Sequence, residues 1–212
     1  MDAPPERGED IRPFLSIARH LTGNSLRAPA LLAADPARGF LLLEDLGDTL
    51  FARVLEADPS LEHRLYRAAT DVLIHLHRCP LPNPVDTYGA QAMAEKAALA
   101  IDWYAPQAGP REALRTAMAD AVDTHAPGTG ALALRDYHAE NLLWLPGDGL
   151  DRVGLLDFQD AMAAHPAYDL VSLLTDARRD IRQDTVRAMI DHYIAEQGIA
   201  AEPFERGFAV LS

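Results

Sequence analysis

Two stretches decide how this chain is interpreted: LRDYHAENLLWLP, residues 134–146, and VGLLDFQDA, residues 153–161. Each joins an apolar run to acids or amides, with Asp136 and Asn141 in the first stretch and Asp157 in the second. Short apolar runs bounded by turn residues predict short buried strands. The turn-rich segment PGDGLDR predicts a hairpin between strands at 142–145 and 153–156. Such a hairpin brings Asn141 and Asp157 close together.

The three polar residues have the chemistry of a metal-assisted reaction. Carboxylate and amide oxygens are suitable ligands for Mg²⁺. Asp136 lies at the mouth of the same loop, where it can orient a hydroxyl group or accept its proton. Phosphoryl transfer needs mainly positioning and charge neutralisation, so an Asp, a following Asn and a second Asp are enough to indicate it. The alternative interpretation is a solvated polar loop.

The rest of the chain predicts an α+β fold. Apolar residues at helical spacing predict a helix over residues 10–21, and two apolar runs around the turn DPARG predict strands at 30–34 and 39–44. Helices are expected from residue 59, at 89–105, at 111–124 and from 166 to the end, with a further strand at 132–134. Because strands and helices are segregated, a doubly wound parallel sheet is not expected.

Composition narrows the class of partner. The 212 residues carry a net charge of −13, and the pI is about 4.9. An acidic chain is a poor partner for nucleic acid or for an anionic membrane surface, but it is compatible with ATP, which Mg²⁺ accompanies. The single cysteine, Cys79, excludes an intrachain disulfide. No apolar run approaches about 20 residues, and the N-terminus has no signal-peptide pattern, so we expect a cytoplasmic protein.

The quoted stretches resemble a known family. RDYHAEN fits D-x-H-x-x-N, the catalytic loop of aminoglycoside-phosphotransferase-like kinases, and LLDFQD resembles their metal-binding segment. Together with GFLLLEDLGD and HPAYDLVSLL, they look most similar to anomeric kinases that phosphorylate C1 of N-acetylmuramate and N-acetylglucosamine in peptidoglycan recycling. The resemblance covers nearly the whole chain. It implies a protein-kinase-like α+β fold, with an incomplete N-terminal lobe and hinge at 1–47 and a mainly helical C-terminal lobe at 48–212.

The resemblance also implies roles for particular residues. Asp136 would be the catalytic base, and Asn141 and Asp157 would bind Mg²⁺ and, through it, ATP. The hinge between the two lobes would be formed by Glu44, Asp45 and Leu46, and its backbone groups would bind adenine.

Five further residues are expected to support the loop or contact the substrate. His138 and Asp169 would brace the catalytic loop. The candidates for contact with the sugar are Tyr137, Asp160 and Arg178.

The chain departs from the family pattern in its first part. Members carry a phosphate-covering loop and a lysine paired with a helix glutamate, whereas the single lysine here, Lys96, lies in a helix predicted for the other lobe. Phe14 stands about where the paired glutamate is expected, and Glu9 and Asp10 are the nearest acids. We therefore expect the sequence to be a fragment at this end. The closing FERGFAVLS, which has no helix stop, gives the same expectation for the other end.

Other functions stay open at this point. An aminoglycoside, choline or related small-alcohol kinase would use the same loop. A non-catalytic kinase-like protein that binds nucleotide would explain the missing lysine. A metal-dependent hydrolase is less favoured, because no His/carboxylate cluster beyond these acids is visible. The sequence carries no signal for an oligomeric state.

Overall fold

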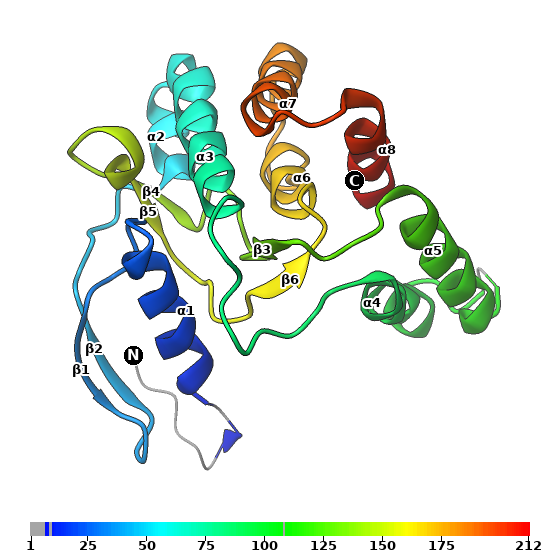
Figure 1. Ribbon diagram of the computed structural model, residues 1–212, viewed down its shortest axis with the longest axis horizontal. Coiled ribbons are helices and arrows are strands. Elements are labelled where there is room, and N and C mark those ends of the chain that lie inside the picture. Colours follow the sequence, from blue (N-terminus) through cyan, green and yellow to red (C-terminus); the bar gives the residue numbers. More distant parts are fainter. Residues whose placement is uncertain (1–6, 9, 108) are drawn as a thin grey trace.

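The first part of the chain is a helix beside a two-stranded hairpin (Figure 1). The computed structural model describes residues 7–8, 10–107 and 109–212, so Glu9 lies outside the described residues. Helix α1 (Arg12–Gly23) buries one apolar stripe, formed by Phe14, Leu15, Ile17, Ala18 and Leu21. These residues follow the spacing of one helical face, as predicted, and the helix begins and ends two residues later than expected.

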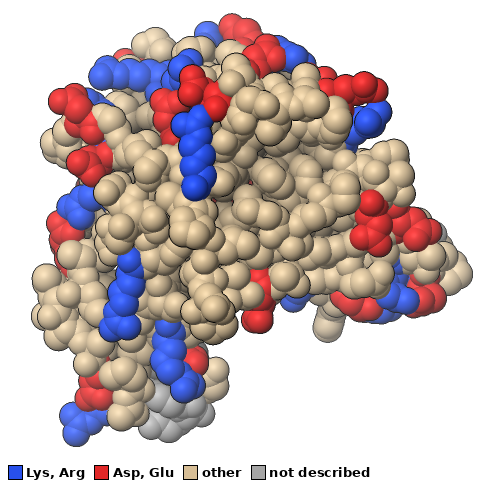
Figure 2. Space-filling model, in the orientation of Figure 1, with Lys and Arg blue, Asp and Glu red and all other residues tan. Residues whose placement is uncertain are grey.

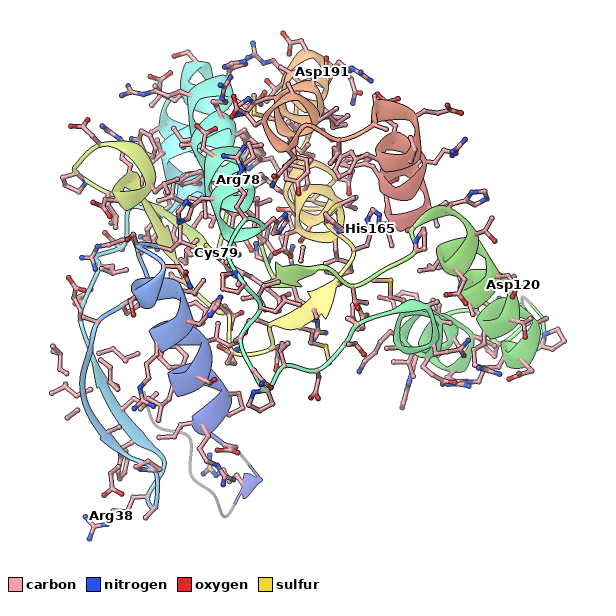
Figure 3. The ribbon with its side chains drawn as sticks, in the orientation of Figure 1. Arg38, Arg78, Cys79, Asp120, His165 and Asp191 are labelled. Atoms are coloured by element: carbon pink, nitrogen blue, oxygen red, sulfur yellow. The ribbon has the colours of Figure 1, made fainter. Side chains whose placement is uncertain are left out.

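Strands β1 (Leu31–Asp35) and β2 (Phe40–Leu43) are antiparallel, with Asp35 opposite Phe40. The backbone N–H of Arg38 donates to the Asp35 carbonyl oxygen at 3.2 Å, which closes the turn. Gly39 has a φ of 75°, a conformation that glycine adopts without steric cost. Figure 3 shows Arg38 at this end of the hairpin. The two strands predicted around DPARG are therefore confirmed.

Two small antiparallel sheets lie among the helices of the larger part. Strands β4 (Leu142–Trp144) and β5 (Val153–Leu155) form the predicted hairpin. Strand β3 (Ala131–Ala133) pairs with β6 (Met162–Ala164), a strand that the sequence did not predict. The sequence of β6 is Met-Ala-Ala, and methionine and alanine favour helices, so only its long-range partner makes it a strand.

Helices surround these sheets (Figure 1). The long ones are close to their predicted ranges, but Asp58 caps a short 3₁₀ turn rather than the long helix that follows it. The helical elements are α2 (Phe51–Ala57), η2 (Pro59–Leu61), α3 (Glu62–Leu76), α4 (Ala90–Trp103), α5 (Arg111–His125), η3 (Gly149–Arg152), α6 (Tyr168–Leu174), α7 (Gln183–Gln197) and α8 (Ala201–Leu211).

One apolar core joins the two parts. It includes residues of α1, α2, α3, α6, α7 and α8, and the ring of Phe14 stacks on that of Phe158 with centroids 4.9 Å apart. The backbone N–H of Leu155 donates to the Arg27 carbonyl oxygen at 2.8 Å, which ties the segment after α1 to β5. The helix and hairpin at the start of the chain are therefore fixed against the strand that leads to Asp157.

Charged side chains of both signs lie on the surface. On the face in Figure 2, Lys and Arg are interspersed with Asp and Glu, and no continuous basic stripe crosses this face. Among the residues that the structure describes, no helix is long and apolar enough to span a bilayer.

Candidate active site

The β4–β5 hairpin brings the two expected metal ligands together. Asn141 directly precedes β4, and Asp157 follows β5 by two residues, at the same end of the hairpin. The backbone N–H of Leu156 donates to the Asn141 carbonyl oxygen at 3.0 Å, which extends the pairing to this end. The Asn141 amide Nδ2 lies 3.4 Å from Asp157 Oδ2. The proximity that the spacing predicted is therefore present.

The same amide reaches Asp136. Asn141 Nδ2 donates to the Asp136 carbonyl oxygen at 3.0 Å, so one side chain connects the loop after β3 with the end of β5. The Asp136 residue is half-buried, and its carboxylate accepts no hydrogen bond from another side chain or backbone group among the described residues. Its oxygens are therefore available to a hydroxyl group. Asp136, Asn141 and Asp157 are called the acid–amide group below.

The backbone is strained at Asp157 and at Arg135, the residue before Asp136. Arg135 has a φ of 74° and Asp157 a φ of 56°, both in the left-handed region that residues other than glycine adopt at a cost. Such conformations persist only where the surrounding structure holds them in place. The contacts of Asp169 and Gln159 supply that support at the two positions.

Asp169, in the first turn of α6, supports the loop that contains Arg135. Its carboxylate accepts the backbone N–H of Leu134 at 2.6 Å and of Arg135 at 2.9 Å, and the residue is only 1% exposed. Burial raises the pKa of Asp169 to about 7, and the two N–H donors oppose that rise. Asp169 therefore holds the backbone of residues 134 and 135, directly before Asp136, and its role in catalysis stays a prediction.

His138 and Gln159 contact the other two members of the group. His138 Nε2 lies 3.4 Å from Asn141 Nδ2, and its carbonyl oxygen accepts the Asn141 backbone N–H at 2.9 Å. Gln159 Nε2 donates to Asp157 Oδ1 at 2.7 Å. Sequence reasoning gave Gln159 no part in the site, although its position two residues after Asp157 was a usable signal.

The donor set fits Mg²⁺. Asp157 offers a carboxylate, and the Oδ1 of Asn141 has no hydrogen-bond partner among the described residues. Mg²⁺ in phosphate sites is held by one or two protein groups together with phosphate oxygens and water. Within the described part of the chain, no three His, Cys, Asp or Glu side chains converge on one point.

The expected hinge follows β2. Glu44 forms a two-pronged ion pair with Arg27 at 2.7 and 2.5 Å, and its backbone N–H donates to the Ala30 carbonyl oxygen. Arg27 thereby lowers the pKa of Glu44 to about 2. The Asp45 carboxylate accepts the Gly47 N–H at 2.8 Å. Among the described residues, no hydrogen bond involves the Glu44 carbonyl oxygen or the Leu46 N–H, so these two backbone groups are available to a ligand.

Tyr137 is not placed to contact a substrate, and that expectation is wrong. The residue is 2% exposed, and its hydroxyl donates to the Ala69 carbonyl oxygen at 2.8 Å. Arg178 is exposed and pairs with the side chains of Asp176 at 3.0 Å and Glu140 at 3.4 Å. Its role as a substrate contact stays a prediction.

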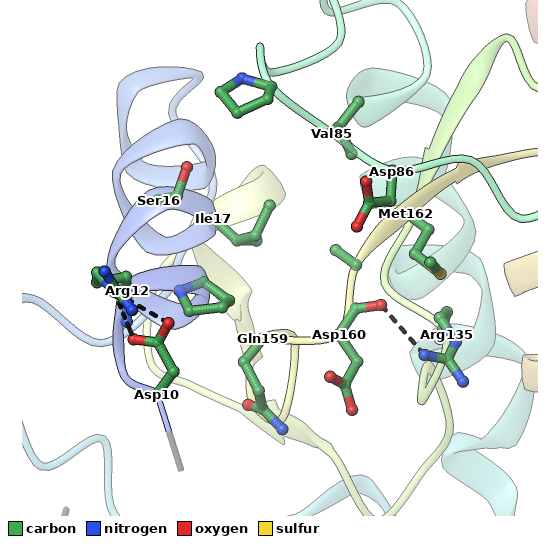
Figure 4. A pocket seen from close by; sticks show the side chains of 13 residues that line it. Asp10, Arg12, Ser16, Ile17, Val85, Asp86, Arg135, Gln159, Asp160 and Met162 are labelled. Carbon is green, nitrogen blue, oxygen red and sulfur yellow. Dashed lines mark hydrogen bonds and ion pairs between the residues drawn. The ribbon is translucent and has the colours of Figure 1, made fainter. Parts of the chain in front are cut away.

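A pocket of about 440 Å³ adjoins the acid–amide group (Figure 4). It lies between the first turns of α1, the segment 84–86 and the segment 159–162, and Arg135 and Asp160 line it. We call it the α1 pocket. Sequence reasoning singled out Asp160 but missed Asp86, which lies 50 residues before Asp136 in a stretch without a distinctive pattern.

Comparisons with known proteins identify the family of the chain. The family model described as "Phosphotransferase enzyme family" matches residues 1–208. The N-acetylmuramate/N-acetylglucosamine kinase of Caulobacter vibrioides is 41% identical over 199 residues, which cover 86% of this chain and 54% of that protein. The kinase of the same name from Pseudomonas putida is 30% identical, over 98% of this chain and 61% of that protein. This chain thus spans little more than half the length of these relatives.

Solved structures give the fold. An aminoglycoside phosphotransferase from Streptomyces rimosus, in complex with ADP and streptomycin, superposes with a TM-score of 0.57 at 20% identity, over 95% of this chain and 82% of that one. A choline kinase from Streptococcus pneumoniae superposes with a TM-score of 0.67 at 14% identity, over 94% of this chain and 66% of that one. The protein-kinase-like α+β fold expected from the sequence is confirmed.

Proposed function

This chain belongs to the phosphotransferase enzyme family, and we propose that the protein transfers the γ-phosphoryl group of ATP to the anomeric hydroxyl of N-acetylmuramate or N-acetylglucosamine. The observation that carries the proposal is the acid–amide group, in a chain 41% identical to a kinase named for these two sugars. Because the chain spans 54% of that relative, the proposal concerns the activity of the whole protein. We place this activity in the cytoplasm.

Asp136 is the proposed base. The sugar hydroxyl oxygen forms a bond to the γ-phosphorus, and the bond from that phosphorus to the β–γ bridging oxygen breaks, so that ADP leaves with the electron pair. The hydroxyl proton passes to the Asp136 carboxylate. An anomeric hydroxyl is more acidic than an ordinary alcohol because a second oxygen on C1 withdraws electrons. An ordinary carboxylate is therefore sufficient to accept the proton.

Asn141 and Asp157 are the proposed metal ligands. Mg²⁺, when bound there, neutralises charge on the phosphates. We also propose that the chain forms two lobes, which meet after residue 47. Adenine would meet the Glu44 carbonyl oxygen and the Leu46 N–H, between the lobes 1–47 and 48–212. The single lysine, Lys96, lies in α4 and has no part in this site.

Two other functions remain as outcomes of the test. The fold neighbours include aminoglycoside and choline kinases, but their identities of 14–20% support only the fold. A non-catalytic nucleotide-binding protein is the second alternative, and the transfer assay distinguishes it from a kinase.

The test is phosphoryl transfer from ATP radiolabelled in its γ-phosphate, with Mg²⁺. N-acetylmuramate, N-acetylglucosamine, kanamycin and choline are offered separately to the chain and to its Asp136→Asn variant. We expect an acid-labile sugar phosphate that depends on Asp136. Label on kanamycin or choline would reassign the acceptor. Nucleotide binding without transfer, in this chain and in one extended to the length of its relatives, would identify a binding protein.

A further inference from the structure

The α1 pocket has the composition of a site for a small polar molecule. Its apolar lining is contributed by Pro13, Ile17, Pro84, Val85, Ala161 and Met162. Its charged lining comes from four segments that are distant in sequence. Asp86, Asp160 and Arg135 lie on one side, and Asp10 and Arg12 lie at the start of α1 (Figure 4). Mostly apolar walls with a few converging polar groups are typical of ligand pockets.

Some of the charged side chains in the pocket pair with each other, and the others can bind a ligand. Asp10 and Arg12 satisfy each other, because Arg12 Nε donates to Asp10 at 2.8 Å. Among the described residues, the carboxylates of Asp86 and Asp160 have no hydrogen bond or ion pair. Arg135 forms no ion pair there, and its guanidinium makes a single long hydrogen bond, from Nη1 to the Asp160 carbonyl oxygen at 3.4 Å. Two acceptor groups and one donor group are thus free.

Arg135 is held in this position by its surroundings. Its guanidinium carbon lies 5.0 Å from the centroid of the Tyr88 ring, and its backbone is fixed by Asp169. A cation over an aromatic face is stabilised in place. The donor therefore need not be ordered when a ligand binds, which lowers the entropic cost of binding.

The pocket borders the acid–amide group at two points. Arg135 directly precedes Asp136, and Gln159 lines the pocket while it donates to Asp157 Oδ1 at 2.7 Å. A ligand in the pocket is therefore next to the groups proposed to transfer phosphate.

We propose that the α1 pocket binds the N-acetylated hexose ring of the acceptor sugar. Of the two proposed acceptors it favours N-acetylglucosamine, which carries no charge, over N-acetylmuramate, whose lactyl carboxylate is repelled by the two free acids. Asp86 and Asp160 accept hydrogen bonds from its ring hydroxyl groups, and Arg135 donates to its acetamido oxygen. This inference rests on the proposed function and adds the location of the acceptor and the groups that recognise it.

The charge balance selects this class of ligand over two others. Once Asp10 and Arg12 are paired, Asp86 and Asp160 outnumber Arg135, so nucleotide phosphates are repelled. A polyamine sugar is attracted to the acids, but it has no amide carbonyl oxygen to accept a hydrogen bond from Arg135. An acetamido group supplies that acceptor without adding charge.

The test measures sugar binding without nucleotide, by calorimetric titration into the full chain. N-acetylglucosamine, glucose and glucosamine are compared for the wild type and for the variants Asp86→Asn and Asp160→Asn. Both residues are exposed, so the variants are expected to fold, which circular dichroism verifies. The matched control is Asp120→Asn, an exposed acid on α5 and far from α1 in Figure 3.

We expect each pocket variant to bind N-acetylglucosamine about tenfold or more weakly, as the loss of a charged hydrogen bond implies, and the control to bind like the wild type. Glucose and glucosamine should bind more weakly than N-acetylglucosamine. Unchanged binding in both pocket variants, no binding by the wild type, or tighter binding of glucosamine would each overturn the inference.

The transfer assay separates this inference from the proposed function. If transfer to the sugar occurs and the pocket variants leave its KM unchanged, the acceptor site is wrong and the kinase activity stands. If the sugar binds through Asp86 and Asp160 but receives no phosphate, even in a chain extended to the length of its relatives, the pocket stands and the kinase activity fails.

Discussion

Replacing Asp169 by asparagine is expected to remove one identifiable component of the pH dependence of stability. The wild-type carboxylate is buried against α6 and accepts two backbone N–H groups of the loop before Asp136. Asparagine has nearly the same shape but never ionises, and it presents one acceptor and one NH₂ group to the two backbone donors. The variant therefore isolates the effect of the buried charge.

The size of the effect follows from the pKa of Asp169. Burial raises it from its ordinary value of 3.8 to about 7, so between these values the folded protein holds a proton that the unfolded chain has lost. The resulting stabilisation is fully present below the unfolded pKa and is lost as the pH rises through about 7. Between about pH 5 and about pH 8 this linkage amounts to roughly 2–3 kcal/mol of unfolding free energy.

The assay is urea unfolding of both proteins at the two pH values. At each pH, the unfolding free energy of Asp169→Asn is subtracted from that of the wild type. This difference should be larger at the lower pH by roughly 2–3 kcal/mol. Asp120→Asn, which changes an exposed carboxylate, should show the same pH dependence as the wild type. Parallel curves for the wild type and Asp169→Asn would refute the claim that Asp169 is a buried acid with a raised pKa.

Three further outcomes are expected. Phe14→Ala removes a buried ring that stacks on Phe158 at 4.9 Å, and urea unfolding should show a loss of about 3–5 kcal/mol; a loss below about 1 kcal/mol would contradict this packing. Tyr137→Phe leaves the Ala69 carbonyl without its donor and should cost about 1–2 kcal/mol in the same assay with no change in the KM for sugar, whereas a raised KM would restore the substrate contact. Asp157→Asn should raise the Mg²⁺ concentration needed for half-maximal nucleotide binding by about tenfold, and an unchanged requirement would exclude Asp157 as a ligand.

Local patterns were sufficient to predict much of the fold and the proximity of two of the proposed reacting groups. The apolar spacing from Phe14 to Leu21 specifies α1, because the helical period alone determines which residues share a face. The turn residues at 146–152 specify the β4–β5 hairpin, and with it the proximity of Asn141 and Asp157. Both inferences use contacts between residues that are near in sequence or joined by one turn.

The features that the sequence did not predict depend on long-range contacts. Strand β6 exists because β3, some 30 residues earlier, offers it a ladder. Tyr137 was a reasonable polar neighbour of Asp136, but its hydroxyl finds the Ala69 carbonyl oxygen 68 residues away in sequence, which takes the ring into the core. The α1 pocket combines four separate segments, so no single window of sequence contains it.

The position of the charged group depends on apolar packing. Phe158 is fully buried and stacks on Phe14, while its neighbour Asp157 is exposed and held in a left-handed conformation. A backbone of this kind is maintained only by its surroundings, so a displacement of α1 is transmitted through the two rings to the Asp157 carboxylate. The lining of the α1 pocket also includes residues of α1, so the same displacement changes that pocket. The stack of Phe14 on Phe158 is therefore a packing contact between the helix that lines the proposed sugar site and the segment that carries the proposed metal ligand, although neither ring belongs to either site.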